Sequence, residues 1–396
     1  MKQFFDYDAE AKESFEAEES IPRKFVQSNK RHDNILVTQA SLEYGNTYSL
    51  FFDLAKYSLW DYFQDPEVFI TAEEKGTVFG RSVGIAGALA FLHDELYLES
   101  TGEQLHCYHL DLKPQNILVF EGRDNRDGKS RHIWKISDFG ISQMKHIKPN
   151  GADVDTDHPV SFLDRIFRPQ KQDTNPSSGV DNSRYGGTYG APEARLTTDK
   201  VTRKSDVWSL GCVLIDVLTF LDNGSIGIEE FGEARAKDRD NDRFFEPTPS
   251  HFGTELNNML HSSVTSWLET LEGKAKERHE LEGKAFRQVS TLLRESMLLM
   301  DQAQRCTAKE AEKRLKRITR QFTRAVAQTP PLTPERSEDS QKPKRKSHVE
   351  SLGARNRVEI SVSSRRSLLA QSWNAWRFPL AAAAVVVGVV YYFSSV

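Results

Sequence analysis

The chain has 396 residues, of which 38% are hydrophobic and 28% are charged, with a formal net charge of -4. This length allows one large domain or two ordinary ones, and the small net charge indicates no particular partner. The three cysteines lie far apart without CxxC spacing, which argues against a disulfide framework or a zinc site. Charge from Lys2 onward, without an apolar run, predicts no secretory signal.

Residues 1–320 alternate apolar runs with turn signals, which is typical of a globular domain. Residues 47–53 are predicted to form a buried strand, and residues 72–95 have the apolar spacing of a helix. Short apolar strands are expected at 116–120 and 133–137, and the polar stretch between them predicts a hairpin connection.

Further along, residues 150–183 are rich in Gly, Pro, Asp and Ser and are predicted to form a long loop. Helices are expected at 205–220, 286–300 and 307–323. Residues 321–377 are largely polar, with Pro, Ser and Arg but no clear periodicity, so we expect a disordered basic linker there.

Two polar motifs flank the predicted hairpin. The sequence HLDLKPQN at 109–116 precedes its first strand, and ISDFG at 136–140 follows its second strand. Two carboxylates and an amide would therefore lie at one end of the hairpin. Phosphoryl transfer needs such groups, because one carboxylate orients the attacking hydroxyl while another carboxylate and an amide oxygen hold Mg²⁺.

These motifs resemble the catalytic loop and the metal-binding DFG motif of protein kinases. Residues 187–193 (GTYGAPE) resemble the end of the activation segment, and residues 206–211 (DVWSLG) resemble the helix whose aspartate braces the catalytic loop. Arg305 resembles the late arginine that pairs with the glutamate of APE. The resemblance covers residues 2–320 and implies an α+β, two-lobed kinase-like fold with an incomplete N-lobe and a mainly helical C-lobe.

By position, the resemblance implies that Asp111 is the catalytic base and that Lys113 neutralises charge on the transferred phosphate. Asn116 and Asp138 would be the metal ligands for Mg²⁺ bound with ATP, and Thr188 would line the substrate pocket. A lysine two places after the aspartate is the serine/threonine pattern, so the expected substrate is a protein with Ser or Thr hydroxyls.

Residues 47–61 resemble the segment that joins the two lobes and binds adenine. Phe52 falls at the gatekeeper position, although the same residue could simply belong to the core. Asp53 and Ala55 would offer backbone groups to adenine, which places both among the expected ATP-binding residues.

The glycine-rich loop of the family is absent, because no G-x-G-x-x-G precedes residue 52. Lys2 resembles the ATP-binding lysine, and we expect it to pair with Glu18 rather than Glu19, because Glu18 has apolar residues at +3 and +7. The two charges could instead be solvated near the terminus. Pro22 is expected to interrupt the helix that carries Glu18.

Two explanations of the missing loop remain open: a truncated gene model that begins inside the lysine strand, which we favour, or a pseudokinase that acts as a binding scaffold. Leu110 stands where many kinases have an arginine that docks a phosphorylated activation loop. Activation by that route is therefore not expected.

Residues 316–377 contain 14 Lys/Arg and 5 Asp/Glu, a local charge of +9. Residues 378–393 carry no charge and are flanked by tryptophans and tyrosines. We expect residues 378–396 to be a C-terminal transmembrane anchor with the kinase domain cytosolic, although a docked core helix or a disordered apolar end is also compatible. Without aromatic residues among the basic ones between 342 and 366, no nucleic-acid partner is expected.

Overall fold

The computed structural model describes residues 1–5, 10–28, 31–98, 102–123, 130–147, 187–195, 201–236, 242–247 and 258–328. The chain divides into two units, Met1–Leu332 and Thr333–Val396. The predicted loop at 150–183, the predicted linker beyond residue 328 and the predicted anchor at 378–396 lie outside the described residues.

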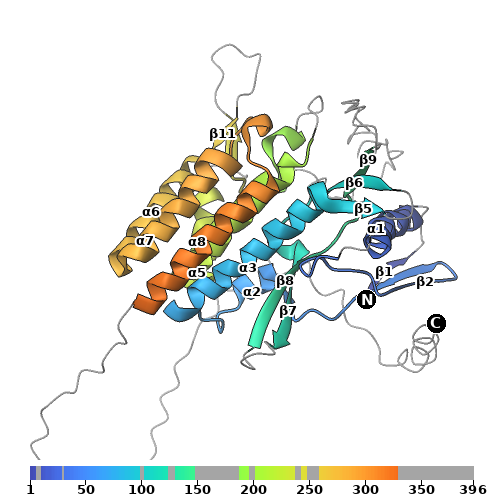
Figure 1. Ribbon diagram of the computed structural model, residues 1–396, viewed down its shortest axis with the longest axis horizontal. Helices are drawn as coiled ribbons and strands as arrows, with labels where there is room; N and C mark the ends of the chain where they lie inside the picture. Colours follow the sequence, from blue (N-terminus) through green and yellow to red (C-terminus); the bar gives the residue numbers. More distant parts are fainter. Residues whose placement is uncertain are drawn as a thin grey trace, which may run out of the picture. The chain divides into compact units, whose positions relative to one another are not determined.

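The N-terminal part of the first unit consists of one helix and a small antiparallel sheet in the order β1-β3-β2 (Figure 1). The strands are β1 (Lys2–Phe5), β2 (Ala40–Tyr44) and β3 (Thr47–Phe51). The central strand β3 is largely buried, as its apolar sequence predicts. Strand β2 is not among the predicted strands, although its sequence ASLEY alternates apolar and polar residues; all five of its residues are exposed.

Helix α1 (Glu10–Gln27) joins two separate clusters of apolar side chains. Near its start, Phe15 packs against the sheet. Near its end, Ile21 and Phe25 belong to the main core. The expected interruption at Pro22 is wrong, because the helix continues through it. The loss of one backbone hydrogen bond at Pro22 is outweighed by the burial of Ile21 and Phe25 on either side.

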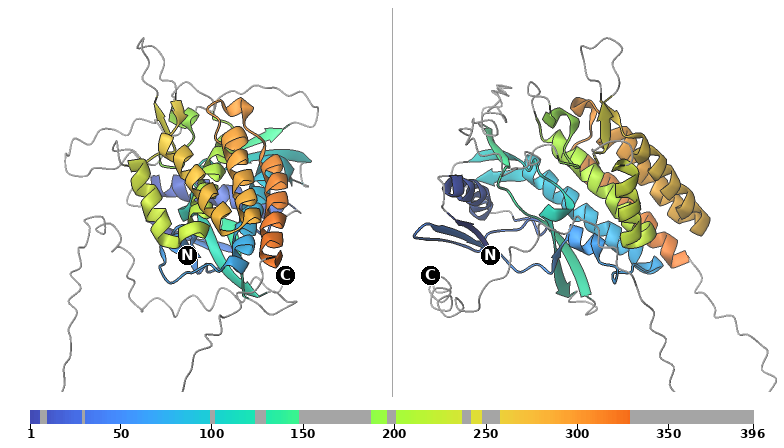
Figure 2. Two further views of the ribbon diagram at one scale, coloured as in Figure 1. Left: turned by 90° about the vertical axis from the view of Figure 1, so that its left-hand side faces the viewer. Right: turned by 180° about the vertical axis from the view of Figure 1, so that it is seen from behind.

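Two further three-stranded sheets lie between the N-terminal part and the large helices (Figure 2). Their strand orders are β4-β7-β8 and β5-β6-β9, all antiparallel. Strands β7 and β8 form the predicted hairpin. The strands are β4 (Tyr57–Ser58), β5 (Leu96–Leu98), β6 (Glu103–Tyr108), β7 (Ile117–Arg123), β8 (Ser130–Ile136) and β9 (Gln143–Ile147).

After α1, residues 34–36 are hydrogen-bonded to strand β8 of the hairpin. Ile35 forms a parallel bridge with Ile136. The Asn34 side-chain amide donates to the Trp134 carbonyl at 2.7 Å. A Cβ at Gly84 would lie 2.5 Å from the Asn34 amide nitrogen, so glycine is required for this close approach.

The C-terminal part is mainly helical and holds the main core. Its α-helices are α2 (Leu59–Gln64), α3 (Ala72–Ala90), α5 (Lys204–Ala236), α6 (Ser262–Arg278), α7 (Glu280–Leu292) and α8 (Ala308–Gln328). Two π-helical turns are η1 (Phe91–Glu95) and η5 (Leu293–Met297), and the 3₁₀ turns are η2 (Pro114–Asn116), η4 (Pro192–Arg195) and η6 (Gln302–Gln304). Two short strands, β10 (Phe245–Pro247) and β11 (Asn258–Leu260), pair with each other.

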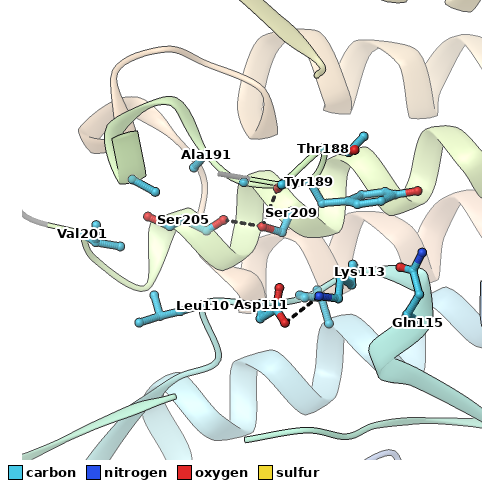
Figure 3. Close-up of a pocket in the computed structure, with 14 residues that line it drawn as sticks. Leu110, Asp111, Lys113, Gln115, Thr188, Tyr189, Ala191, Val201, Ser205 and Ser209 are labelled. Carbon is cyan, nitrogen blue, oxygen red and sulfur yellow. Dashed lines mark hydrogen bonds and ion pairs between the residues drawn. The ribbon is translucent and has the colours of Figure 1, made fainter. Parts of the chain in front are cut away.

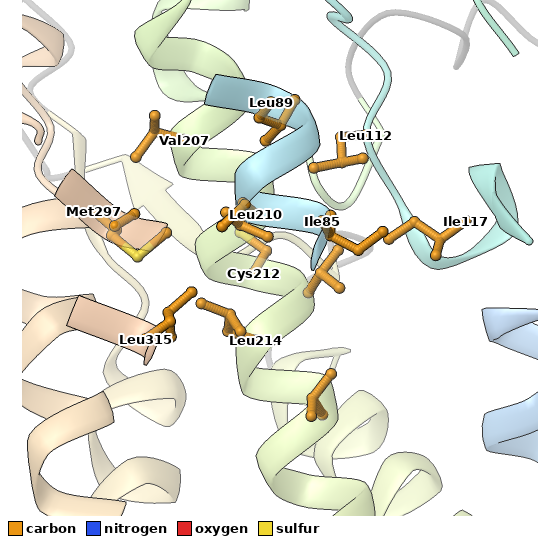
Figure 4. Close-up of a cluster of buried hydrophobic side chains, with 14 of the residues drawn as sticks. Ile85, Leu89, Leu112, Ile117, Val207, Leu210, Cys212, Leu214, Met297 and Leu315 are labelled. Atoms are coloured by element: carbon orange, nitrogen blue, oxygen red, sulfur yellow. The ribbon is translucent and has the colours of Figure 1, made fainter. Parts of the chain in front are cut away.

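Helix α5 lies at the centre of this core (Figure 4). Its residues Leu210 and Leu214 pack among side chains of α3, η5 and α8. Within the described residues, α5 is the one helix with the length and hydropathy to cross a membrane, but its apolar part is largely buried in the domain. Asn223 and Gly224 (φ +58°) have non-helical backbone angles, which places a kink within α5.

The predicted domain boundary at residue 320 is wrong by at least one helical turn. Helix α8 continues to Gln328, so residues 321–328 belong to the folded domain and not to the linker. The physical reason is Phe322, which is buried with its ring 4.9 Å from that of Phe79 and 5.6 Å from that of Phe286. In other respects the predicted α+β architecture, with a small N-terminal part and a helical C-terminal part, is confirmed.

Candidate active site

The loop between β6 and β7 positions Asp111. The Lys113 ammonium lies 2.8 Å from Asp111 Oδ2. The Asn116 amide nitrogen donates both to the Asp111 carbonyl at 2.8 Å and to Asp111 Oδ2 at 2.9 Å. These donors hold one carboxylate oxygen, and since the Asn116 nitrogen is used here, its amide oxygen is left to act as an acceptor or a metal ligand.

A buried carboxylate at the start of α5 fixes the backbone of this loop. Asp206 accepts hydrogen bonds from the backbone N–H groups of His109 at 2.9 Å and Leu110 at 2.7 Å. It also contacts His93 Nε2 at 2.8 Å. Burial favours the neutral acid, but the His93 contact and the remaining donors outweigh it and lower the pKa of Asp206. Leu110 has φ +66°, a strained conformation for leucine that this bond stabilises.

Asp138 follows β8 and lies at the same end of the hairpin as Asn116. Its φ of +63° places it in the left-handed region. The preceding residue, Ser137, is bound on both sides: its hydroxyl donates to the Asn116 carbonyl at 3.0 Å, and its own carbonyl contacts His109 Nε2 at 2.9 Å. These bonds hold Asp138 beside the loop that carries Asp111.

Lys2, Glu18 and Asp138 form one charged cluster. Lys2 Nζ lies 2.5 Å from Glu18 and 3.3 Å from Asp138. Burial raises the pKa of Glu18 despite the neighbouring Lys2, and the two carboxylates raise the pKa of Lys2 in spite of its burial. Glu19 pairs instead with Arg23 at 2.8 Å. The structure thus brings together the pair expected from the sequence, and Glu18 is the partner.

A chain of aromatic contacts connects α1 to the catalytic loop. Phe139 is buried, with its ring 5.1 Å from that of Phe25 and 5.2 Å from that of His109, both in edge-on geometry. Since Phe25 lies on the helix that carries Glu18, the position of that helix depends on the segment that carries Asp138.

The segment after β3 contains the expected adenine-binding residues. Phe52 is half-buried and packs on the cluster of Phe15, Tyr48 and Leu50, so it contributes to the core. Asp53 is exposed and Ala55 is half-buried. The next residue is fixed by a hydrogen bond from the Lys56 N–H to the Val119 carbonyl at 2.9 Å, which joins this segment to β7.

Glu193 and Arg305 form the ion pair that the sequence predicts. The Arg305 guanidinium binds both carboxylate oxygens of Glu193 at 2.7 Å, and both residues are buried. Ser205 adds a hydroxyl donor to Glu193 at 2.6 Å. This bidentate pair joins the 187–195 segment to the helical core.

A pocket of about 350 Å³ lies beside Asp111 (Figure 3). Thr188 lines it, as expected, but its hydroxyl donates to Asp242 at 2.6 Å rather than to Asp111. Its lining residues are Leu110, Asp111, Leu112, Lys113, Gln115, Gly187, Thr188, Tyr189, Gly190, Ala191, Ala194, Val201, Ser205 and Ser209.

The hydroxyl of Tyr189, one of the lining residues, donates to Asp216 at 2.6 Å in a buried contact. Burial raises the pKa of Asp216 to about 6, although the charge of Arg235 opposes this shift. Neither Asp216 nor Asp242 was singled out from the sequence. The one available signal was the position of Asp216 inside the apolar run GCVLIDVL at residues 211–218.

A Mg²⁺ site is compatible with the groups present. Among the described residues, no group of three His, Cys, Asp or Glu side chains could hold a metal by itself. Asn116 and Asp138 supply one amide oxygen and one carboxylate, which suits an ion that takes few protein ligands and binds mainly phosphate and water.

Comparisons with known proteins agree with this geometry. The protein kinase domain family matches residues 6–315. The serine/threonine-protein kinase/endoribonuclease IRE1 of Hypocrea jecorina is 25% identical over 217 residues, covering 51% of this chain and 15% of that protein. The mitogen-activated protein kinase hog1 of Botryotinia fuckeliana is 27% identical over 218 residues, covering 54% and 46%. The mitogen-activated protein kinase mpkC of Aspergillus oryzae is 29% identical over 171 residues, covering 40% and 37%.

The aligned region spans less than half the length of each of these curated relatives. A crystal structure of a kinase domain aligns with 18% identity and a TM-score of 0.38, covering 78% of this chain and 85% of that one, which is too loose to add to the argument. The family match over residues 6–315, together with the ordered motifs, shows that the chain belongs to the eukaryotic protein kinase superfamily.

Proposed function

We propose that this protein is a serine/threonine protein kinase that transfers the γ-phosphate of ATP to hydroxyls of protein substrates. The observation that carries the proposal is the contact of Lys2 with both Glu18 and Asp138, which aligns α1 with the catalytic loop. The lysine–glutamate pair and the metal-binding aspartate must both be in place for phosphoryl transfer in kinases.

Each charged residue of the site has a role in this proposal. Asp111 orients the substrate hydroxyl and accepts its proton, and Lys113, 2.8 Å away, stabilises negative charge on the transferred group. Asn116 and Asp138 would hold Mg²⁺, which neutralises phosphate charge when bound with ATP. Lys2 would contact the ATP phosphates, and the backbone of Asp53 and Ala55 would contact adenine.

The serine/threonine class is proposed from Lys113, two residues after Asp111. The matched relatives that are named as serine/threonine-protein or mitogen-activated protein kinases support it. The test is phosphoamino-acid analysis of a generic basic protein incubated with radiolabelled ATP and the full chain. Phosphoserine or phosphothreonine is expected, and Asp111→Asn should lower incorporation by about two to four orders of magnitude. Equal incorporation by both proteins would refute catalysis by this site.

A pseudokinase scaffold is the second candidate, since no G-x-G-x-x-G precedes residue 52. Turnover of ATP that depends on Asp111, measured beside binding of a fluorescent ATP analogue, distinguishes the two candidates. A scaffold would show no turnover that depends on Asp111, whether or not it binds nucleotide.

We also propose that the kinase is held at the cytosolic face of a membrane by residues 378–396. The support comes from the 16 uncharged residues at 378–393, which follow a basic segment. Retention of the intact chain in membranes after alkaline extraction is expected, and its release would contradict this proposal.

A further inference from the structure

Helix α8 presents a row of basic side chains on the face opposite its buried one. Its apolar face packs on α3 and α7, with Leu315, Ile318 and Phe322 at most 4% exposed. Figure 1 shows α8 as the orange helix beside α3. Its basic stripe consists of the exposed residues Lys313, Arg317, Arg320 and Arg324.

The spacing of the stripe places all four residues on one line. Steps of 4, 3 and 4 residues along α8 keep them within about 60° of the helix circumference and about 17 Å of its length. Leu315 and Phe322 alternate with them on the opposite side, so the stripe faces directly away from the core.

In the part of the chain that the structure describes, other basic residues of α8 have partners, whereas no partner is found there for the stripe. Lys309 pairs with Glu95 and Lys316 with Glu312, and Arg314 donates to Ser296. Within the described part of the chain, no ion pair involves any of the four stripe residues. The four positive charges lie on a helix whose opposite face is buried. Without nearby counter-charges they make the local electrostatic potential more positive, which attracts an anionic partner.

We propose that the α8 stripe docks the kinase domain against the headgroups of anionic lipids. The ten Lys/Arg and five Asp/Glu between residues 329 and 377 add charge of the same sign, and the uncharged stretch at 378–393 follows. The choice of partner therefore rests on the membrane association proposed above. The stripe carries no exposed aromatic side chain on which bases could stack, which disfavours single-stranded nucleic acid.

The contact would be electrostatic and peripheral, because the apolar face of α8 is already buried in the domain. Each Lys or Arg near an anionic surface contributes about a fivefold gain in binding, and the effect decays within about 10 Å. Removing four charges that all lie near the surface would weaken binding about 600-fold, and a loss of at least tenfold is expected if only two of them do.

The test uses the full chain and vesicles of phosphatidylcholine with or without about one third phosphatidylserine. Lys313, Arg317, Arg320 and Arg324 are changed together to Gln. The matched control changes the same number of exposed charges on other helices: Lys12, Lys276, Lys284 and Arg287 to Gln. Thermal unfolding is measured for both variants, and both are expected to show the cooperative transition of the parent.

Both sets are examined in a background with Val386→Arg and Val390→Arg, which would abolish insertion of the apolar stretch. In that background, salt-sensitive binding that requires phosphatidylserine should fall at least tenfold in the stripe variant and about twofold or less in the control. Equal binding by both variants would overturn the proposal, as would stripe-dependent binding to poly(U) RNA without binding to vesicles. Alkaline extraction of the parent chain, which keeps Val386 and Val390, tests the C-terminal anchor separately. The stripe proposal and the anchor proposal can therefore fail independently.

Discussion

The small cluster around Leu50 and the main core around α5 contribute unequally to one active site. The first consists of Phe15, Tyr48 and Leu50, with Phe4 and Phe52 at its edge, and it supports Lys2. The second extends from α3 to α8 and supports Asp111 through Asp206. The residues proposed for catalysis in the C-terminal part are thus held by a large buried network, whereas Lys2 depends on a few contacts. Helix α1 has an end in each cluster and connects them.

The largest predicted effect tests the network of the C-terminal part. Arg305→Met would leave Glu193 buried without its counter-charge, at a cost of about 3–5 kcal/mol in the free energy of unfolding. Urea denaturation measures this cost. The double variant Glu193→Gln/Arg305→Met should recover part of the loss, because no buried charge remains. A single variant as stable as the parent would show that this pair is not important for the core.

A matched pair of leucines compares the two clusters directly. Leu50 and Leu214 are both 0% exposed. Leu214→Ala should lower the main unfolding free energy by about 2–5 kcal/mol. Leu50→Ala should act locally, with faster hydrogen exchange in β1 and β3 and reduced kinase activity, but a smaller change in the main transition. Equal shifts of the main transition would mean that the two clusters unfold as one unit.

The pH dependence of stability examines the buried Asp216. Its pKa of about 6 in the folded protein lies above the ordinary value of 3.8. Its stabilising contribution is therefore complete below about pH 4 and is lost as the pH rises to about 6, a change of about 3 kcal/mol. Asp216→Asn should flatten the stability profile in this range, whereas Glu43→Gln on exposed β2 should not. A profile unchanged by Asp216→Asn would contradict the burial argument.

The smallest predicted effect concerns the N-terminal side of the site. Lys2→Met should lower kcat/KM for ATP about a hundredfold, because one positioned donor to the phosphates is lost. Thermal stability should fall less than in Arg305→Met, since the Lys2 side chain is 39% exposed, although the buried Glu18 loses its counter-charge. Lys12→Met, on the exposed surface of α1, is the control and should retain full activity. Normal ATP kinetics in Lys2→Met would favour the view that Lys2 and Glu18 form only a structural ion pair.

Features that depend on local spacing could be predicted from the sequence, whereas features that join distant residues could not be predicted from spacing alone. Asp111, Asn116 and Asp138 lie in short motifs whose spacing reflects the local geometry of a hairpin, so their proximity was predictable. The Glu193–Arg305 pair was predictable only through the family resemblance, because 112 residues separate its partners.

The remaining features depend on tertiary packing. The Tyr189–Asp216 contact and the bond from Thr188 to Asp242 join residues with no local signal. The continuation of α8 to Gln328 depends on the packing of Phe322, which a polar and basic sequence conceals. Similarly, α1 passes through Pro22 because buried neighbours compensate for a residue that is unfavourable in an isolated helix.

The bridge between Ile35 and Ile136 has a consequence for motion within the domain. Because Asn34 and Leu36 are also bound to β8, residues 34–36 belong mechanically to the C-terminal part although they follow α1 in the chain. Any swing of the N-terminal sheet and α1 must therefore pivot on the residues that join them to the C-terminal part, which are 31–33 after α1, 37–39 before β2 and 52–55 after β3. Such a swing would lengthen or shorten the distance between Lys2 and Asp138 while the Asp111 loop stays in place. Lys2 would then be the residue of the site that moves.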